Sequence, residues 1–138
     1  MALVRTGMAQ WNGDLKSGEG TVKVESGAFD TQYSYKSRFE EGTGTNPEEL
    51  IGAAHAGCYS MALSNMLAEA GHTPESVQTT AKVKMEGLEI MSVTLETKGS
   101  VPGIDQAEFE KYAEDAKKNC PVSKALAALE IELDAKLV

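Results

Sequence analysis

A long stretch of small and apolar residues runs from position 46 to position 71 and restricts the folds that this chain can adopt. Asn46 is a favourable N-cap, Pro47 suits the first helical position, and Glu49 can return a hydrogen bond to the cap. We expect the helix to stop just before Gly71, which can adopt the left-handed conformation. Because the segment is apolar on nearly all sides, it predicts a central helix.

Cys58 lies in the middle of this predicted helix. Helical spacing places it on a stripe that we expect to face the interior, together with Leu50, Ala54, Met61, Ala62 and Asn65. The residues around the thiol are small, which lets another helix or a second chain come close. They are Gly52, Ala53, Ala54, Ala56 and Gly57. The pattern alone leaves Cys58 either a small core residue or a reactive thiol.

The first forty residues predict strands, because short segments are separated by glycine-containing stretches at 12–14 and 18–20. Val22 and Val24 would share one strand face. In the segment 33–39 we expect Arg38 to point away from the aromatic face formed by Tyr33, Tyr35 and Phe39.

The second half of the chain predicts a hairpin, a helix and a strand. Alternating runs at 77–85 and 91–97, joined by a turn, predict the hairpin. A capping box of Asp105 and Glu108 opens a helix whose inward positions are Phe109, Tyr112, Ala113, Ala116 and Cys120. Residues 129–137 alternate without error between apolar and charged, which predicts a strand.

This order of elements predicts an α+β fold with mainly antiparallel sheets. The long central helix carries Cys58, and the second helix ends near Cys120. A length of 138 residues suits one domain, residues 1–138, with no internal boundary.

Charge and composition exclude several classes of function. The 21 acidic residues outnumber the 13 basic ones, and a net charge of -8 repels nucleic acids and anionic membranes. No apolar window approaches the roughly 18 residues that span a bilayer, so we expect a cytoplasmic protein without a membrane partner. Two cysteines are too few for a secreted disulfide scaffold, which leaves redox, metal-binding or inert roles.

A reactive thiol needs a group that stabilises its thiolate, because a free cysteine has a pKa of about 8.5. Arg38 is the candidate cation for Cys58, and Glu48 could hold its guanidinium. Cys120 has another route, since it stands at the expected N-cap of a short helix that begins at Pro121, where free amides favour a thiolate. Sequence alone does not show that the two thiols meet.

Two other interpretations concern the histidines and the aromatic residues. His55, Cys58, Cys120 and His72 form a conceivable zinc set, but only one pair is close in sequence. Aromatic residues are more often core than pocket, yet some could line an apolar cleft: Tyr33, Tyr35, Phe39, Tyr59, Phe109 and Tyr112.

Two long motifs resemble those of the osmotically inducible protein C and organic hydroperoxide resistance protein family. They are TNPEELIGAAHAGCYSMAL and VPGIDQAEFEKYAEDAKKNCPVSKAL. Two further segments resemble the osmotically inducible branch in particular, namely GMAQWNGDLKSGEGTV and SRFEEGTGTNPEEL. Gly57 and Tyr59 replace the alanine and phenylalanine often seen beside the first cysteine, which affects pocket shape rather than chemistry.

The resemblance implies a thiol-dependent peroxidase of oxidative and osmotic stress defence, working as an intertwined homodimer with its sites at the subunit interface. Cys58 would be the peroxidatic thiol, Cys120 the resolving thiol, Arg38 the cation and Glu48 the residue that orients it. Organic hydroperoxides would be reduced better than hydrogen peroxide, through a Cys58 sulfenic acid and a Cys58–Cys120 disulfide. The implied reductant is a dithiol such as dihydrolipoamide or a lipoylated protein, and no cofactor, metal or flavin is required.

Two rival hypotheses are also compatible with the sequence. A redox-sensing or small-apolar-ligand binding dimer with the same cysteines would be oxidised once without turnover. A zinc-bound structural domain would retain metal on purification.

Overall fold

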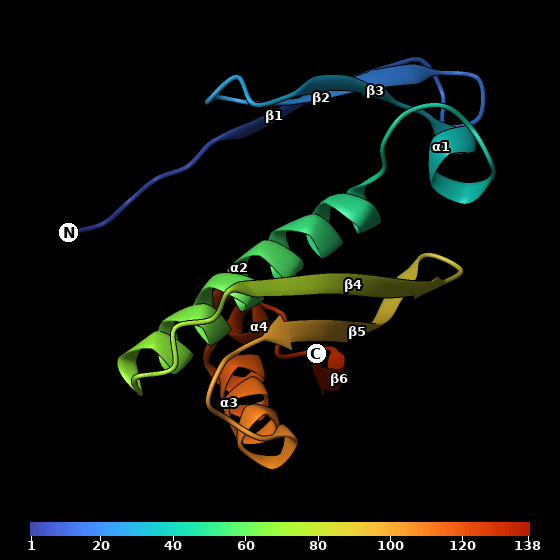
Figure 1. Cartoon of the computed structure of the whole chain (residues 1–138). Helices are drawn as coiled ribbons and strands as arrows, with labels where there is room; N and C mark the ends of the chain where they lie inside the picture. The colour runs from blue at the N-terminus through green and yellow to red at the C-terminus, as the bar shows by residue number, and fades with distance from the viewer. The chain divides into compact units, whose positions relative to one another are not determined.

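The computed structural model describes all residues from Met1 to Val138 and confirms the α+β fold class. The chain divides into two compact units, Met1–Leu50 and Ile51–Val138, and each contains its own three-stranded sheet (Figure 1). The expectation of one undivided domain stays a prediction. None of the helices combines the length and the apolar character needed to cross a bilayer.

The first unit contains an antiparallel sheet of β1 (Gly7–Asn12), β2 (Glu19–Val24) and β3 (Asp30–Tyr33) in that order. The strands expected up to Tyr33 are thus confirmed. Gly20 lies within β2, where a side chain would collide with the rings of Trp11 and Tyr33. These two rings lie 5.2 Å apart between centroids, so the glycine permits their packing.

The prediction of a strand over 33–39 is wrong beyond Tyr33, because α1 (Tyr35–Phe39) is a short helix. Ser34 caps it by accepting the Ser37 amide, while the Ser37 hydroxyl accepts the Ser34 amide, which completes a capping box. Tyr35 and Phe39 therefore pack by helical spacing, with ring centroids 5.0 Å apart. This local hydrogen bonding outweighs an alternation that only resembles a strand.

The long helix is confirmed as α2 (Pro47–Glu69). Asn46 accepts the Glu49 amide at 2.8 Å, but the Glu49 carboxylate accepts from the Thr45 hydroxyl instead of the expected return to the cap. Gly71 has a φ of 89°, as predicted for the residue that ends the helix.

The prediction that the Cys58 stripe is the inward face of α2 is wrong. Within the second unit, the fully or nearly buried positions of α2 are instead Gly52, His55, Tyr59, Leu63 and Leu67. Ala54 and Met61 are exposed, and Cys58 is half-buried at the border of the buried face. Periodicity could not place the face, because α2 is apolar or small on almost every side.

The second unit contains a mixed sheet of β4 (Ser76–Glu86), β5 (Glu89–Ser100) and β6 (Glu130–Leu137). The hairpin of β4 and β5 and the C-terminal strand are confirmed, and β6 pairs parallel to β5. Val93, Leu95 and Thr97 of β5 face the core, whereas Met91 is exposed near a register shift in the hairpin.

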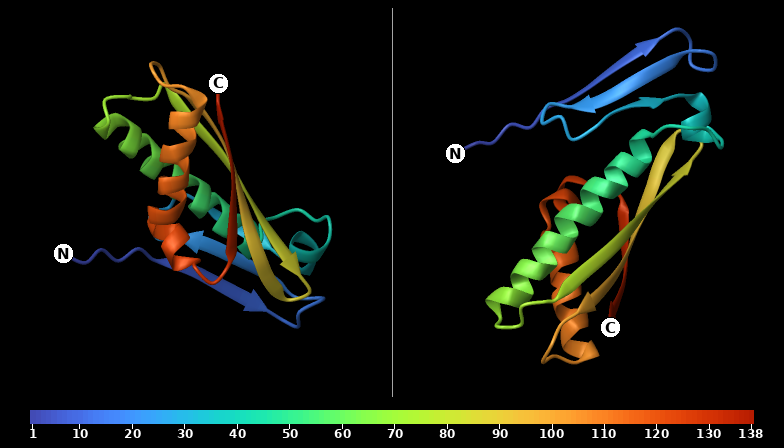
Figure 2. Two further views of the ribbon diagram at one scale, coloured as in Figure 1. Left: turned by 90° about the horizontal axis from the view of Figure 1, so that it is seen from below. Right: turned by 45° about the horizontal axis from the view of Figure 1, so that its top comes forward.

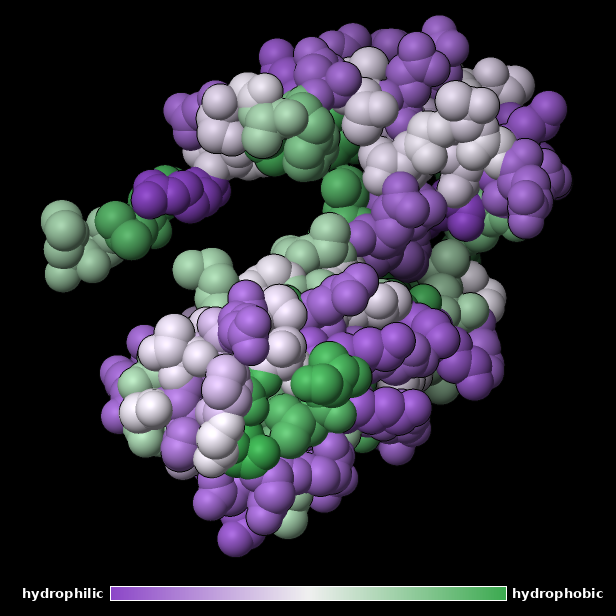
Figure 3. Space-filling view, in the orientation of Figure 1, coloured by the Kyte–Doolittle hydropathy of each residue, from purple (hydrophilic) through white to green (hydrophobic).

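The sheet has one face in the core and one polar face. Helices α2 and α3 (Gln106–Asn119) lie on the core face (Figure 2). Gly99 of β5 permits this packing, since a side chain there would collide with the Phe109 ring. On the opposite face, Lys82 and Glu96 form an ion pair at 2.6 Å. Hydrophilic residues cover much of the visible surface (Figure 3), in keeping with the acidic composition.

Helix α3 ends at Asn119, and the short helix α4 (Pro121–Ala125) follows directly. Asp105 caps α3 by accepting the Glu108 amide at 2.8 Å. The predicted inward positions Phe109, Ala113 and Ala116 are buried, and so is Cys120 at the junction of the two helices. Pro121 enforces this junction, because proline suits the first position of a helix and not its interior.

Candidate active site: a thiol pair and a held arginine

The two cysteines, 62 positions apart in sequence, meet within the second unit. Their sulfur atoms lie 3.3 Å apart, and both thiols are free. Cys58 is half-buried, whereas Cys120 is fully buried. A disulfide has an S–S bond of about 2.05 Å, so the atoms must approach by only about 1.3 Å to bond. The pair can therefore form a disulfide without large rearrangement of the fold.

Cys120 is positioned by the cap that the sequence predicts. Its sulfur accepts the Ser123 amide at 3.5 Å, in the place where an N-cap oxygen normally accepts. The same residue ends α3, where its own amide donates to the Ala116 carbonyl at 2.9 Å. Cys120 is thus held by backbone bonds on both sides.

The two thiols have opposite pKa shifts. Burial raises the pKa of Cys58, the Val122 amide offsets part of this, and Cys120 raises the pKa further. Burial also raises the pKa of Cys120, but hydrogen bonds from the Ser123 amide and hydroxyl and from Cys58 outweigh it, and the pKa is lowered. The groups that shift Cys58 include no cation, so residues 51–138 by themselves favour a protonated Cys58.

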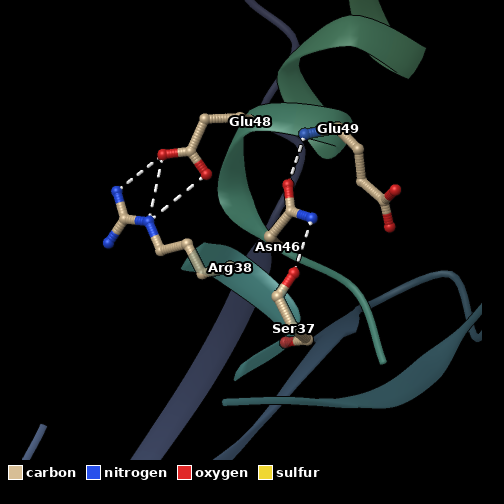
Figure 4. Close-up of polar contacts among 5 residues, drawn as sticks. All are labelled: Ser37, Arg38, Asn46, Glu48 and Glu49. Carbon is tan, nitrogen blue, oxygen red and sulfur yellow. Dashed lines mark hydrogen bonds and ion pairs between the residues drawn. The ribbon is translucent and has the colours of Figure 1, made fainter. Parts of the chain in front are cut away.

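Arg38 and Glu48 form an ion pair within the first unit (Figure 4). The guanidinium donates from Nε to both carboxylate oxygens, at 3.0 and 3.3 Å, and from Nη2 to Oε1 at 2.7 Å. The Glu48 side chain is 9% exposed and that of Arg38 is 33% exposed. The buried carboxylate fixes the arginine, while Nη1 takes part in none of these bonds and is available to another group.

The segment that carries this pair is fixed by polar contacts of its own. Asn46 donates to the Ser37 carbonyl at 3.1 Å and caps α2 through its other amide atom (Figure 4). Ser37 is buried and donates to the Thr45 carbonyl at 2.7 Å. Helix α1, with Arg38, is thereby tied to the start of α2, with Glu48.

A cavity of about 370 Å³ lies beside Arg38 in the first unit. Its lining is mostly apolar and aromatic: Trp11, Gly13, Leu15, Tyr33, Ser34, Tyr35, Arg38 and Phe39. Three of the aromatic residues predicted as possible cleft residues line this cavity, namely Tyr33, Tyr35 and Phe39. Tyr59 and Phe109 are instead fully buried in the core of the second unit. Arg38 also stacks on Phe39, with its guanidinium carbon 5.2 Å from the ring centroid.

The sequence did not identify Ser123 as part of the site, and it offered His55 only as a zinc ligand. His55 is fully buried, and its Nε2 lies 2.7 Å from the Ser123 hydroxyl. Ser123 could have been identified from the sequence, because it is the third residue after the Cys120 cap and the amide at that position faces the cap atom in any helix. No group of three or more His, Cys, Asp or Glu side chains is arranged to hold a metal ion.

The family model described as OsmC-like protein matches residues 40–134. Peroxiredoxin OsmC of Escherichia coli is 51% identical over 142 residues, covering 99% of each chain. Organic hydroperoxide resistance protein-like 1 of Staphylococcus saprophyticus is 28% identical, covering 86% of this chain and 88% of its own.

A solved structure has the same fold. The crystal structure of an OsmC-like protein from Mycoplasma pneumoniae superposes with a TM-score of 0.76 at 17% identity, covering 100% of this chain and 99% of its own. With the match of the family model and the full-length identity to Peroxiredoxin OsmC, the chain belongs to the OsmC-like protein family.

Proposed function

We propose that Cys58 and Cys120 carry out the reaction of a thiol-dependent peroxidase that reduces organic hydroperoxides. Relatives named peroxiredoxin and organic hydroperoxide resistance protein identify the chain as a cysteine-based peroxidase, an oxidoreductase. The observation that carries the mechanism is the 3.3 Å separation of two free thiols from distant parts of the chain.

Cys58 is the peroxidatic thiol in this proposal. Its thiolate attacks one peroxide oxygen, the O–O bond breaks, and an alcohol leaves after taking up a proton. Cys58 becomes a sulfenic acid, which condenses with Cys120 to a disulfide and releases water. The half-buried position of Cys58 supports this order, because a peroxide can reach it more easily than the fully buried Cys120.

Arg38 supplies the cation that Cys58 needs, and Glu48 holds Arg38 in place. The raised pKa of Cys58 supports this assignment, since the second unit offers no cation to stabilise its thiolate. The free Nη1 of a fixed guanidinium also suits a peroxide oxygen that gains charge as the O–O bond breaks.

The substrate class follows from the cavity beside Arg38. Its aromatic and aliphatic lining suits the organic group of a hydroperoxide better than hydrogen peroxide, which buries no carbon. We therefore infer that organic hydroperoxides are the better substrates and hydrogen peroxide the poorer one.

The working form is proposed to be a cytoplasmic, intertwined homodimer with its sites at the subunit interface, acting in oxidative and osmotic stress. The exposed small residues Ala53, Ala54 and Gly57 of α2 support a second copy, because a neighbouring backbone can approach them closely. The reductant is proposed to be a dithiol such as dihydrolipoamide or a lipoylated protein, which reopens the disulfide by thiol exchange.

Peroxide consumption in the presence of dihydrolipoamide tests the proposal. The unchanged protein is expected to turn over cumene hydroperoxide repeatedly, whereas Cys58→Ser and Cys120→Ser lose turnover. Sulfenic acid should be trapped only in Cys120→Ser. A single oxidation of the unchanged protein without turnover would favour a redox sensor instead, and full activity of Cys58→Ser would exclude the proposed mechanism.

A further inference from the structure

His55 is a buried polar residue that the proposed reaction does not yet use. Its side chain is fully buried on α2, Nε2 lies 2.7 Å from the Ser123 hydroxyl, and Nδ1 is buried without a hydrogen-bond partner. Burial lowers the pKa of His55, so the ring is neutral near pH 7. A neutral imidazole has one N–H donor and one acceptor nitrogen.

The unpartnered Nδ1 determines which nitrogen carries the hydrogen. A hydrogen on Nδ1 would leave a buried N–H donor without an acceptor, which costs more than a buried lone pair without a donor. The hydrogen therefore belongs on Nε2, and His55 donates to the Ser123 hydroxyl oxygen. The single hydrogen of that hydroxyl must then point away from His55.

Ser123 lies at the sulfur of Cys120. Its amide donates to Sγ at 3.5 Å, and its hydroxyl also lowers the pKa of Cys120. We propose that His55 is a positioning residue for the resolving step: it turns the Ser123 hydroxyl toward Cys120 and so prepares that sulfur for attack. This inference rests on the proposed function, because it assigns Cys120 the resolving role.

The step in question joins the two sulfurs. The Cys120 sulfur attacks the sulfur of the Cys58 sulfenic acid, the S–S bond forms and the S–O bond breaks. The departing hydroxide takes up the proton that the Cys120 thiol gives away and leaves as water. Cys120 is oxidised and the sulfenic sulfur is reduced, while His55 keeps its hydrogen throughout.

Few titratable groups face Cys120. Cys58 lies at 3.3 Å, Tyr59 of α2 interacts with it electrostatically, and Glu114 of α3 acts on Tyr59 in turn. His55 reaches it through Ser123. Since no basic side chain is among the groups that shift Cys120, its thiolate depends on hydrogen bonds, and the Ser123 amide donates one of them at 3.5 Å.

The rate of disulfide formation tests the hydroxyl. The full-length protein is oxidised with one equivalent of cumene hydroperoxide, and sulfenic acid and disulfide are followed by mass spectrometry after dimedone trapping. Loss of a hydrogen bond to a charged group is expected to slow conversion of sulfenic acid to disulfide about tenfold in Ser123→Ala. Ser123→Thr keeps the hydroxyl and should retain most of the rate. Equal rates in Ser123→Ala and the unchanged protein would overturn the proposal.

Ser60→Ala is the matched control for Ser123→Ala. Ser60→Ala also removes a hydroxyl from the second unit, but that hydroxyl donates to Thr79 at 2.8 Å, so the disulfide rate should not change.

A cycle of variants tests whether His55 acts through Ser123. His55→Leu should slow disulfide formation about as much as Ser123→Ala, and His55→Gln, which can place an N–H near the Nε2 position, should restore the rate. The double variant of His55→Leu and Ser123→Ala should be no slower than Ser123→Ala. Additive losses would show that His55 does not act through Ser123.

A second measurement separates this inference from the proposed function. In the Cys58→Ser background, the pKa of Cys120 is measured by thiolate absorbance and should rise in Ser123→Ala and His55→Leu, but not in His55→Gln. If Cys58 is never oxidised in any variant, the proposed function fails. If Cys58 is oxidised but the Cys120 pKa does not change with Ser123, only the inference fails.

Discussion

At the residue scale, the chemistry depends on how each sulfur is stabilised. Cys120 has its stabilising groups nearby in sequence, because Ser123 lies one helical turn away, and the N-cap position was therefore predictable. Cys58 has no such group nearby in sequence, only the distant Val122 amide, and its pKa is raised by burial. The proposed roles of Arg38 and Glu48 follow from this difference.

Substitution of Arg38 is expected to slow oxidation of Cys58 most strongly. Loss of one close cation is worth about one to two pKa units, so Arg38→Ala should react about 10- to 100-fold more slowly near neutral pH. Glu48→Gln keeps the arginine but loses the ion pair, so its oxidation rate should lie between those of the unchanged protein and Arg38→Ala. Stopped-flow oxidation by cumene hydroperoxide measures the rates. Arg5, the other arginine of the chain, is exposed, and Arg5→Ala is the control. Equal effects of both alanine variants would contradict the assignment.

His55 also predicts a dependence of stability on pH. Its folded pKa lies below the ordinary value of 6.5, so the unfolded chain binds a proton first as the pH falls. The free energy of unfolding of the unchanged protein, relative to that of His55→Gln, should be constant above about pH 7 and decline below about pH 6.5. Urea unfolding over this range measures the difference. A constant difference would mean that His55 titrates normally in the fold.

At the element scale, the sequence predicted most helices and strands but not how they face one another. Helix α2 and the strand β6 follow directly from caps and alternation. Helix α1 was missed because its five residues are set by the Ser34–Ser37 capping box, not by apolar periodicity. The buried face of α2 was misplaced because small residues surround it, and the meeting of Cys58 with Cys120 is a tertiary contact that no local pattern encodes.

A hydrogen bond in the core joins α2, which carries Cys58, to α3, which ends just before Cys120. The Tyr59 hydroxyl of α2 donates to the Ala113 carbonyl of α3 at 3.0 Å in the core. Tyr59→Phe should lower the free energy of unfolding by about 1 kcal/mol, because the ring stays packed and only this bond is lost. Chemical denaturation tests this value. An unchanged stability would show that the bond contributes nothing to the packing of α2 against α3.

At the scale of the whole molecule, the proposed homodimer would place a second copy against the exposed small residues of α2. A side chain at Gly57 would meet no atom of its own chain within 4 Å. Gly57→Leu should therefore leave the fold intact but weaken the proposed homodimer by steric overlap. Light scattering over a dilution series measures the dissociation constant. Gly7→Leu is the control, because exposed Gly7 has neither a strained φ nor close neighbours. Gly27 is unsuitable, since its φ of 81° would strain a leucine. A dimer that weakens equally in Gly7→Leu would contradict this role of α2.

Mass spectrometry of the protein after one equivalent of cumene hydroperoxide tests the proposed mechanism most directly. We expect a Cys58–Cys120 disulfide within each chain of the unchanged protein, because the sulfurs already lie 3.3 Å apart in one chain. We also expect sulfenic acid on Cys58 in Cys120→Ser and no oxidised cysteine in Cys58→Ser. First oxidation of Cys120 with Cys58 unmodified, or the absence of this disulfide, would contradict the proposed mechanism.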